Sequence, residues 1–179
     1  VPEDVAIPAR PVPDSARDRT LRRASDTLVA AGFCEAMTRS VVAAPLEATA
    51  SPWGDAAPLV CSPPLVRGAD RLRRTLLPSL LEARAANVAV GTQRPELFET
   101  ARGYLARPAT DGAAGLSPVE EPLLLGFVTS GGFAVAKGLT EAVLQRLGVE
   151  AGTVGAGRVV YRPVDGLDLF ASGRAAEVV

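Results

Sequence analysis

Three stretches of this chain carry apolar residues at the three- and four-residue intervals of a helix, and a glycine closes each stretch. The closing glycines are Gly32, Gly91 and Gly148, and glycine suits the left-handed residue that follows a helix end. The apolar stripe of the first helix consists of Leu21, Ala24, Leu28 and Ala31. The predicted helices run from Ser15 to Ala31, from about Pro78 to Val90, and from just after Gly132 to Gly148.

Segments rich in β-branched or apolar residues lie between these helices, as is typical of strands. The predicted strands cover residues 33–42, which lead to Pro45, and then 59–61, 95–107, 121–129, 158–161 and 175–178. The 121–129 segment is nearly all apolar, as expected for a strand that is covered on both faces. This order of elements predicts an α+β fold in which helices flank a mostly antiparallel sheet.

The first 14 residues have prolines at positions 2, 8, 11 and 13, a spacing that forbids a helix and favours an extended chain. We therefore predict a linker over residues 1–14 and one domain over residues 15–179, because a chain of 179 residues fits about one domain. Residues 45–58 are small and turn-rich and are expected to form a surface loop docked by Trp53. The start at Val1, followed by this proline-rich segment, suggests a piece of a longer protein.

The composition excludes several classes of function. Histidine is absent, which removes catalytic triads, imidazole bases and the usual zinc sites. Nineteen basic and 20 acidic residues leave a net charge of -1, which lacks the footprint of a protein that binds duplex nucleic acid. The longest apolar run, 123–128, is far shorter than the ~20 residues that cross a bilayer. We expect a soluble, cytoplasmic protein without membrane contact.

Few motifs suggest a chemical site. Ser130-Gly131-Gly132 lies between a predicted strand and a predicted helix, where its N–H groups could hold an anion, but a plain backbone turn is favoured. Two groups of arginines form the basic clusters: Arg17, Arg19, Arg22 and Arg23, and then Arg67, Arg71, Arg73 and Arg74. Such clusters usually lie on solvated faces, which is the interpretation we favour. Glu99 and Arg102, on one predicted strand, form no recognisable acid/base pair.

Several segments in a fixed order resemble the beta subunit of bacterial phenylalanyl-tRNA synthetase. They are LRRASDTLVAAGFCEAMTRSVV (21–42), LRRTLLPSLLEARAANVAVG (72–91), LFETARGYL (97–105), LLLGFVTSG (123–131), AVAKGLTEAVLQRLG (134–148) and SGRAAEV (172–178). The resemblance covers most of the chain, from about Ile7 onward. Weak motifs in the right order at the right intervals are far more specific than any one of them.

The resemblance implies a class II synthetase fold that has lost the chemistry of the catalytic alpha subunit. It implies assembly with alpha in a heterotetramer that forms phenylalanyl-tRNA, with ATP, magnesium and tRNA bound by the whole complex. The glycine-rich motif that ends in arginine in active class II synthetases is absent. Arg102 lies near the place where those active synthetases carry an ATP-contacting arginine, and here it is expected to be structural. The family's histidine before the last strand is replaced here by Ala171-Ser172.

The resemblance therefore predicts interface residues only. No catalytic, cofactor-binding or metal residue is assigned, and the predicted interface residues are Leu21, Ala24, Leu28, Ala31 and Pro45. Two other functions stay open. A working adenylate-forming ligase would need charged groups that converge on the sheet to clamp phosphates. An RNA-binding module would need the arginines to gather on one surface.

Cys34 and Cys61 are predicted to stay reduced and metal-free, because no third thiol or imidazole exists to complete a site. Freshly purified protein, alkylated without a reductant and weighed by mass spectrometry, should carry two alkyl groups. A mass two hydrogens below the reduced chain, with no alkylation, would reveal an intramolecular disulfide and contradict this prediction.

Overall fold

The computed structural model describes residues 14–48, 57–107, 119–149, 161–164, 170 and 175–178. Its helices are α1 (Ala16–Ala30), α2 (Ala44–Ala48), α3 (Leu77–Ala89) and α4 (Gly132–Arg146). Its strands are β1 (Cys34–Glu35), β2 (Val41–Val42), β3 (Arg71–Leu72), β4 (Leu97–Arg102), β5 (Leu105–Ala106), β6 (Val119–Glu120), β7 (Leu123–Val128), β8 (Tyr161–Val164) and β9 (Ala175–Val178). None of these helices is long and apolar enough to cross a membrane.

The first helix begins and ends where the sequence predicts. Ser15 is the N-cap, and its side chain accepts a hydrogen bond from the Asp18 N–H at 3.1 Å. The Asp18 carboxylate accepts from the Ser15 N–H and hydroxyl in return, which lowers the pKa of Asp18 and completes a capping box. Gly32 follows the helix with a φ of 90°, in the left-handed region that favours glycine. The second and third predicted helices correspond to α3 and α4.

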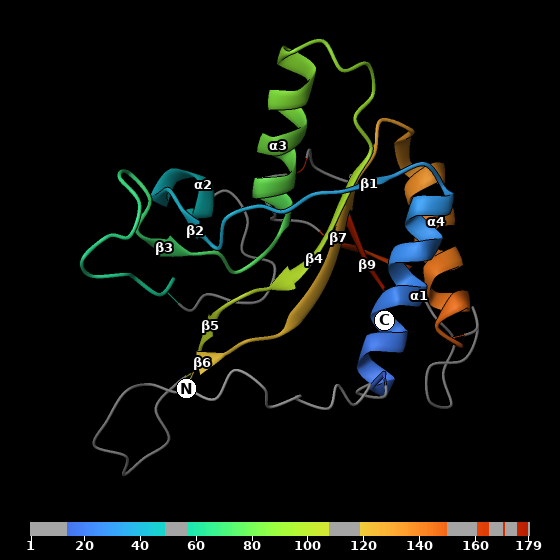
Figure 1. The fold of residues 1–179 in the computed structure, drawn as a ribbon, viewed down its shortest axis with the longest axis horizontal. Coiled ribbons are helices and arrows are strands. Elements are labelled where there is room, and N and C mark those ends of the chain that lie inside the picture. Colours follow the sequence, from blue (N-terminus) through green and yellow to red (C-terminus); the bar gives the residue numbers. More distant parts are fainter. Residues whose placement is uncertain are drawn as a thin grey trace, which may run out of the picture.

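A three-stranded sheet with the order β1-β4-β7 lies at the centre of the fold (Figure 1). The strands β4 and β7 run antiparallel over six residue pairs, from Leu97 opposite Val128 to Arg102 opposite Leu123. The short β1 pairs parallel with the start of β4. The smaller pairs β2–β3, β5–β6 and β8–β9 are all antiparallel, so the mixed α+β architecture agrees with the predicted class.

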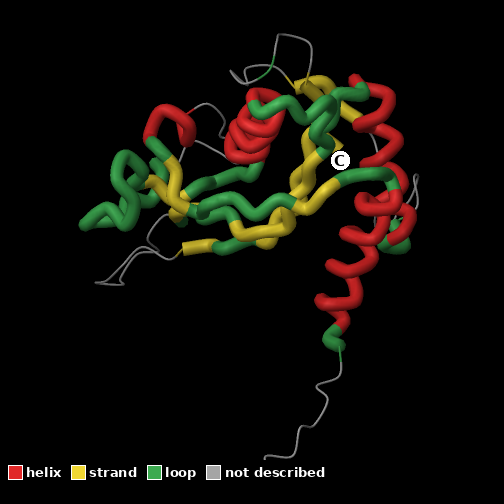
Figure 2. Tube along the Cα trace, turned by 45° about the horizontal axis from the view of Figure 1, so that its top comes forward, coloured by secondary structure: helices red, strands yellow, loops and turns green. Residues whose placement is uncertain are grey.

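Helices cover both faces of this sheet, which therefore has one core on each side. On one face, α1 and α4 lie side by side (Figures 1 and 2). The core beneath them consists of Ala24, Leu28, Phe33, Phe98 and Val143. On the other face lies α3, and the core beneath it consists of Leu76, Leu80, Leu97 and Val128. Successive side chains of β4 enter opposite cores because a strand alternates its faces.

The predicted strand over 33–42 is wrong in its middle, where the structure has two short strands in different sheets. The backbone leaves the central sheet after Ala36, whose N–H donates to the Phe98 carbonyl at 2.7 Å. Two residues later, the Thr38 N–H donates to the Glu99 side chain at 3.0 Å. A side chain has replaced the backbone ladder at this point, so the pairing with β4 stops.

The predicted surface loop over 45–58 contains a helix that the sequence analysis missed. The five-residue α2 spans Ala44–Ala48, and Glu47 is buried although its neighbour Pro45 is exposed. The rest of that loop, with Trp53, lies outside the described residues. The predicted strand at 59–61 is reduced to a single bridge between Val60 and Arg71, and β3 was not predicted. These elements are too short for a periodic pattern to indicate them.

The prediction that the 121–129 strand is covered on both faces is also wrong. Leu123 and Leu125 on β7 are 36% and 37% exposed, and their face of the sheet is shared with Phe98 and Phe127. The helices α1 and α4 pack on that face near Phe98 and Phe127 alone. An apolar run of six residues cannot distinguish a fully covered strand from one that is covered over half its length.

The last two strands agree with the sequence only in part. The described strands are β8 and β9, paired antiparallel from Tyr161 opposite Val178 to Val164 opposite Ala175. Lys137 on α4 lies 5.2 Å from the Tyr161 ring centroid. Burial, together with the carboxylate of Glu141, raises the pKa of Tyr161. Residues 158–160 and the first 13 residues of the predicted 1–14 linker lie outside the described residues.

Replacing Leu28 tests the core beneath α1. The Leu28 side chain is fully buried, so Leu28→Ala should lower the free energy of unfolding by about 3 kcal/mol through lost burial and a residual cavity. The neighbouring Val29 is 57% exposed, so Val29→Ala should change that free energy by less than about 0.5 kcal/mol. Urea unfolding followed by circular dichroism measures both. Equal losses in the two variants would contradict the placement of α1.

Candidate functional site

The most concentrated polar group in the described residues is a buried ion pair on the α3 face of the sheet. Arg73, between β3 and α3, places Nη1 and Nη2 each 3.2 Å from Oε1 of Glu99 on β4. The two side chains are 3% and 4% exposed. Buried charges of this kind are stable only when they are paired and fully hydrogen-bonded.

Thr38 completes the hydrogen bonds of this pair. Its N–H donates to Glu99 Oε1 at 3.0 Å, and its hydroxyl donates to Oε2 at 2.6 Å. The same hydroxyl accepts from Arg73 Nη1 at 2.6 Å. Arg73 Nε donates to the carbonyl of Arg102 at 3.2 Å. The carboxylate and the guanidinium are therefore hydrogen-bonded by groups from three segments of the chain: the segment between β1 and β2, the segment before α3, and β4.

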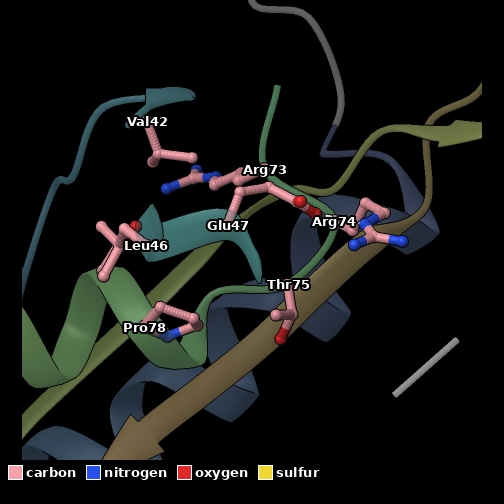
Figure 3. A pocket seen from close by; sticks show the side chains of 8 residues that line it. Val42, Leu46, Glu47, Arg73, Arg74, Thr75 and Pro78 are labelled. Atoms are coloured by element: carbon pink, nitrogen blue, oxygen red, sulfur yellow. Dashed lines mark hydrogen bonds and ion pairs between the residues drawn. The ribbon is translucent and has the colours of Figure 1, made fainter. Parts of the chain in front are cut away.

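A second buried ion pair lies beside the first. Arg74 donates through Nε to the Glu47 carboxylate on α2, and their side chains are 10% and 4% exposed. Figure 3 shows both side chains around a small cavity near Thr75, with Val42 and Pro78 on its walls. The cavity has a volume of ≈ 10 Å³, which is room for about one water molecule. It cannot hold a nucleotide or an amino acid.

The rest of the α3 face is closed by apolar packing. A Cβ built on Gly126 would lie 3.1 Å from Leu80 Cδ1 and 3.2 Å from Leu76 Cβ, so α3 approaches β7 as closely as a glycine permits. A Cβ on Gly103 would lie 2.8 Å from the Arg74 carbonyl oxygen, so the chain before α3 also presses on the end of β4. Leu76 and Leu80 thus fill the space between the start of α3 and β7.

The turn before α4 binds a carboxylate side chain of the same chain. The carboxylate of Glu96 accepts from the Ser130 N–H at 3.1 Å and also from the Ser130 hydroxyl. Partial burial would raise the pKa of Glu96, but hydrogen bonds from Ser130 and Thr129 outweigh it and lower that pKa. The stabilisation is complete above the ordinary glutamate pKa and is lost as the pH falls through the lowered value. The Ser130-Gly131-Gly132 turn thus anchors the start of β4 to α4.

A match to a known protein family identifies the family of this chain. Residues 5–179 match the profile of the family described as the phenylalanyl tRNA synthetase beta chain CLM domain. The chain belongs to this family. The resemblance drawn from the sequence motifs is thereby confirmed.

Curated relatives agree with the family. The beta subunit of phenylalanine–tRNA ligase from Rhodopirellula baltica is 38% identical over 178 residues, which cover 99% of this chain and 25% of that subunit. The corresponding subunit from Anaeromyxobacter dehalogenans is 35% identical over 98% of this chain and 24% of its own length. That from Geobacillus kaustophilus is 29% identical, over 99% of this chain and 22% of its length. The chain therefore spans about a quarter of the length of these relatives.

Solved structures support the fold. Two structures of pyrrolysyl-tRNA synthetase from Desulfitobacterium hafniense superimpose with TM-scores of 0.56 and 0.57, at 17% and 20% identity. The matches cover 84% and 82% of this chain and 50% of each of those chains. The CLM domain thus has the predicted class II synthetase fold, with helices on both faces of its sheet.

Arg102 of this CLM domain has partners of its own. Its Nη1 donates to the Glu121 carbonyl at 2.8 Å, and its Nε lies 3.7 Å from the Glu121 carboxylate. Arg107, on the same side of the hairpin, pairs with Glu120 at 2.7 Å. Among the described residues, no group of three His, Cys, Asp or Glu side chains is placed to hold a metal ion.

The predicted interface residues of the CLM domain lie in different environments. Ala24 and Leu28 belong to the domain's own core, Leu21 is half-buried, and Ala31 and Pro45 are exposed. A partner could reach only the last three without rearrangement. Their role in an interface stays a prediction.

One of the two basic clusters is not a solvated face, so that part of the sequence interpretation is wrong. Arg73 and Arg74 are buried, whereas Arg67 of the same cluster and Arg17 of the α1 cluster are exposed. The acidic partners could not be recognised from the sequence, because Glu99 is 26 residues from Arg73 and Glu47 is 27 residues from Arg74. One available signal was the position of both arginines directly before the apolar start of α3.

Removal of one partner of the Glu99–Arg73 pair should strongly lower the stability of the CLM domain. Glu99→Ala leaves a buried guanidinium without a carboxylate and should lower the free energy of unfolding by about 3–5 kcal/mol. The apolar double variant Arg73→Met/Glu99→Leu should recover most of that loss, since no charge stays buried. Urea denaturation measures both.

Arg22→Ala is the matched control, because Arg22 and Asp14 form a pair that is 63% and 45% exposed. Its expected cost is below about 1 kcal/mol. A cost for Glu99→Ala no larger than that of the control would show that the pair is not buried in solution.

Proposed function

We propose that this chain is a non-catalytic domain of a phenylalanyl-tRNA synthetase beta subunit, and that it serves assembly by packing against the alpha subunit. The observation that carries the proposal is the closed α3 face of the sheet. There, Glu99 and Arg73 neutralise each other, and Leu76 and Leu80 fill the remaining space against β7. A catalytic face would present free charged groups to phosphates and a cavity for an amino acid.

The wider functions in this proposal belong to the complex rather than to these residues. The chain spans about a quarter of the length of its curated relatives, which are named as beta subunits of phenylalanine–tRNA ligase. In the proposal, the alpha subunit carries the chemistry in a cytoplasmic heterotetramer, and tRNA, ATP and magnesium bind outside this domain. Arg102, which lies near the place of the ATP-contacting arginine in active synthetases, is engaged by Glu121.

Two rival functions receive less support. A working ligase would need phosphate clamps, but the arginines nearest the sheet, Arg73 and Arg102, are engaged with Glu99 and Glu121. An RNA-binding module would need arginines gathered on one surface. Arg73 and Arg74 are buried, and Arg107 is paired with Glu120, so this requirement is not met by them.

Exposed apolar side chains on α1 and on the segment that follows it support the proposed assembly role. Beside α1 and the segment that leads to Pro45, Val29 is 57% exposed and Met37 is 98% exposed. Ala31, at the end of α1, is exposed as well. Exposed apolar groups that gather beside polar residues are characteristic of protein interaction surfaces. Burial of such a surface contributes about 25 cal/mol per Å2 to association before entropic costs.

Titration with purified alpha subunit tests this function. The chain should form a complex at micromolar concentrations, detected by analytical ultracentrifugation, and should catalyse no phenylalanine-dependent exchange of pyrophosphate into ATP above a blank. A sample free of host synthetase is essential for the exchange assay. Exchange by the chain alone would establish the ligase function instead, and the absence of any complex with alpha would contradict the assembly role.

A further inference from the structure

A surface groove of ≈ 490 Å³ lies between α3 and the group formed by α2, β2 and the turn at residues 66–69. Figure 1 shows α3 standing beside this group, and Figure 2 shows the same neighbours from a second direction. The floor and walls are mainly small or apolar, with Val41, Val42, Leu46, Ala83 and Ala86 among the lining residues. The groove adjoins the water-sized cavity beside Arg74, and the two share Val42, Leu46 and Ser79 in their linings.

Charges line the groove unevenly. Arg39 and Arg67 lie along the side of β2 and the turn, and Glu82 lies on the α3 side. All three side chains are exposed, and none forms a hydrogen bond or an ion pair with the described residues. These two guanidinium groups contrast with Arg73, Arg74, Arg102 and Arg107, each of which has a carboxylate partner. The groove thus keeps two unneutralised positive charges above an apolar floor.

Two large, exposed apolar residues directly precede lining residues of the groove in the sequence. Met37 directly precedes the lining residue Thr38 and is 98% exposed, and Leu65 directly precedes Val66 and is 78% exposed. Each of the two lining segments therefore offers an exposed apolar side chain two residues before an unpaired arginine. Exposed apolar groups that extend an apolar groove enlarge its contiguous apolar surface, and contiguous apolar surface rimmed by polar residues marks contact sites for other proteins. Methionine, which is flexible and polarisable, adapts to partner surfaces particularly well.

The chemistry of the groove selects among possible occupants. Nucleic acid is disfavoured because the lining residues include no aromatic ring for base stacking, and Glu82 would repel phosphates from the α3 wall. A protein segment satisfies every feature, since its carboxylates can meet the arginines while its apolar side chains cover Met37, Leu65 and the floor.

We propose that this groove binds an extended acidic segment of the alpha subunit that carries apolar side chains between its carboxylates, a proposal that rests on the assembly function proposed above. The arginines steer the segment and fix its register, and the apolar contacts slow its release. Association should therefore weaken as the salt concentration rises, because the arginines are exposed.

Charge reversal measures the contribution of the arginines. The variant Arg39→Glu/Arg67→Glu should bind purified alpha subunit about tenfold more weakly than the unchanged chain, with a smaller dependence on salt. The matched control is Arg146→Glu/Arg162→Glu, which changes the same total charge at two exposed arginines on α4 and β8. Surface plasmon resonance at low and physiological salt gives both affinities and rates, and circular dichroism verifies that each variant is folded.

Removing the apolar contacts gives a second, independent readout. Met37→Asp should raise the dissociation rate from alpha, and its exposure means that folding is unaffected. Val90→Asp is its control, because Val90 is 83% exposed just beyond the end of α3 and does not line the groove. Faster release for Met37→Asp alone supports the proposed apolar contact.

The remaining outcomes separate this inference from the assembly function. If alpha binds the unchanged chain and all four variants equally, the groove is not the contact and only this inference fails. Equal weakening by both charge reversals also overturns it, because the effect would be one of net charge. If Arg39→Glu/Arg67→Glu loses binding to tRNA while keeping its affinity for alpha, the occupant of the groove is nucleic acid, which overturns the inference. Failure of the unchanged chain to bind alpha overturns the inference and the assembly function together.

Discussion

The arrangement of the other elements depends on the hydrogen bonds and the ion pair of the buried Glu99 carboxylate. It accepts hydrogen bonds from Thr38 and Arg73, and Arg73 reaches on to the backbone of β4. The chain between β1 and β2, the chain before α3 and the central strand are thereby held at one point. Removal of these charges from water is costly, so the contact tolerates little displacement of any segment. The parallel pairing of β1 with β4 ends where this carboxylate takes the Thr38 N–H.

This arrangement places the start of α3 against the sheet and determines what the sheet can do. Arg73 and Arg74 anchor the chain just before α3, and Leu76 and Leu80 then press on β7 at Gly126. The space between the start of α3 and the sheet is thereby filled by the domain's own side chains. Beyond the buried start of α3, its exposed second half forms one wall of the groove. One helix therefore closes a face at its beginning and opens a surface further along.

The helices and the long strands were predictable because their signals are local and repeated. The capping box at Ser15, the stripe through Leu28, and the glycine at position 32 each indicate α1 independently, and β4 and β7 have six residues apiece. Two-residue strands such as β2 and the five-residue α2 lack enough residues to show a period. Their positions come from contacts with distant residues, such as that of Glu47 with Arg74.

The sequence by itself determined the α+β class, the three long helices and, through its ordered motifs, the synthetase family. Those properties depend on residue type and spacing along the chain, which a single sequence contains. Only the tertiary structure decided that Arg73 and Arg74 are buried, while Arg39 and Arg67 are exposed and have no partner among the described residues. All four are arginines between positions 39 and 74, so neither residue type nor spacing distinguishes them. The difference arises because folding brings Glu99 and Glu47 to one pair and leaves the other beside an open groove.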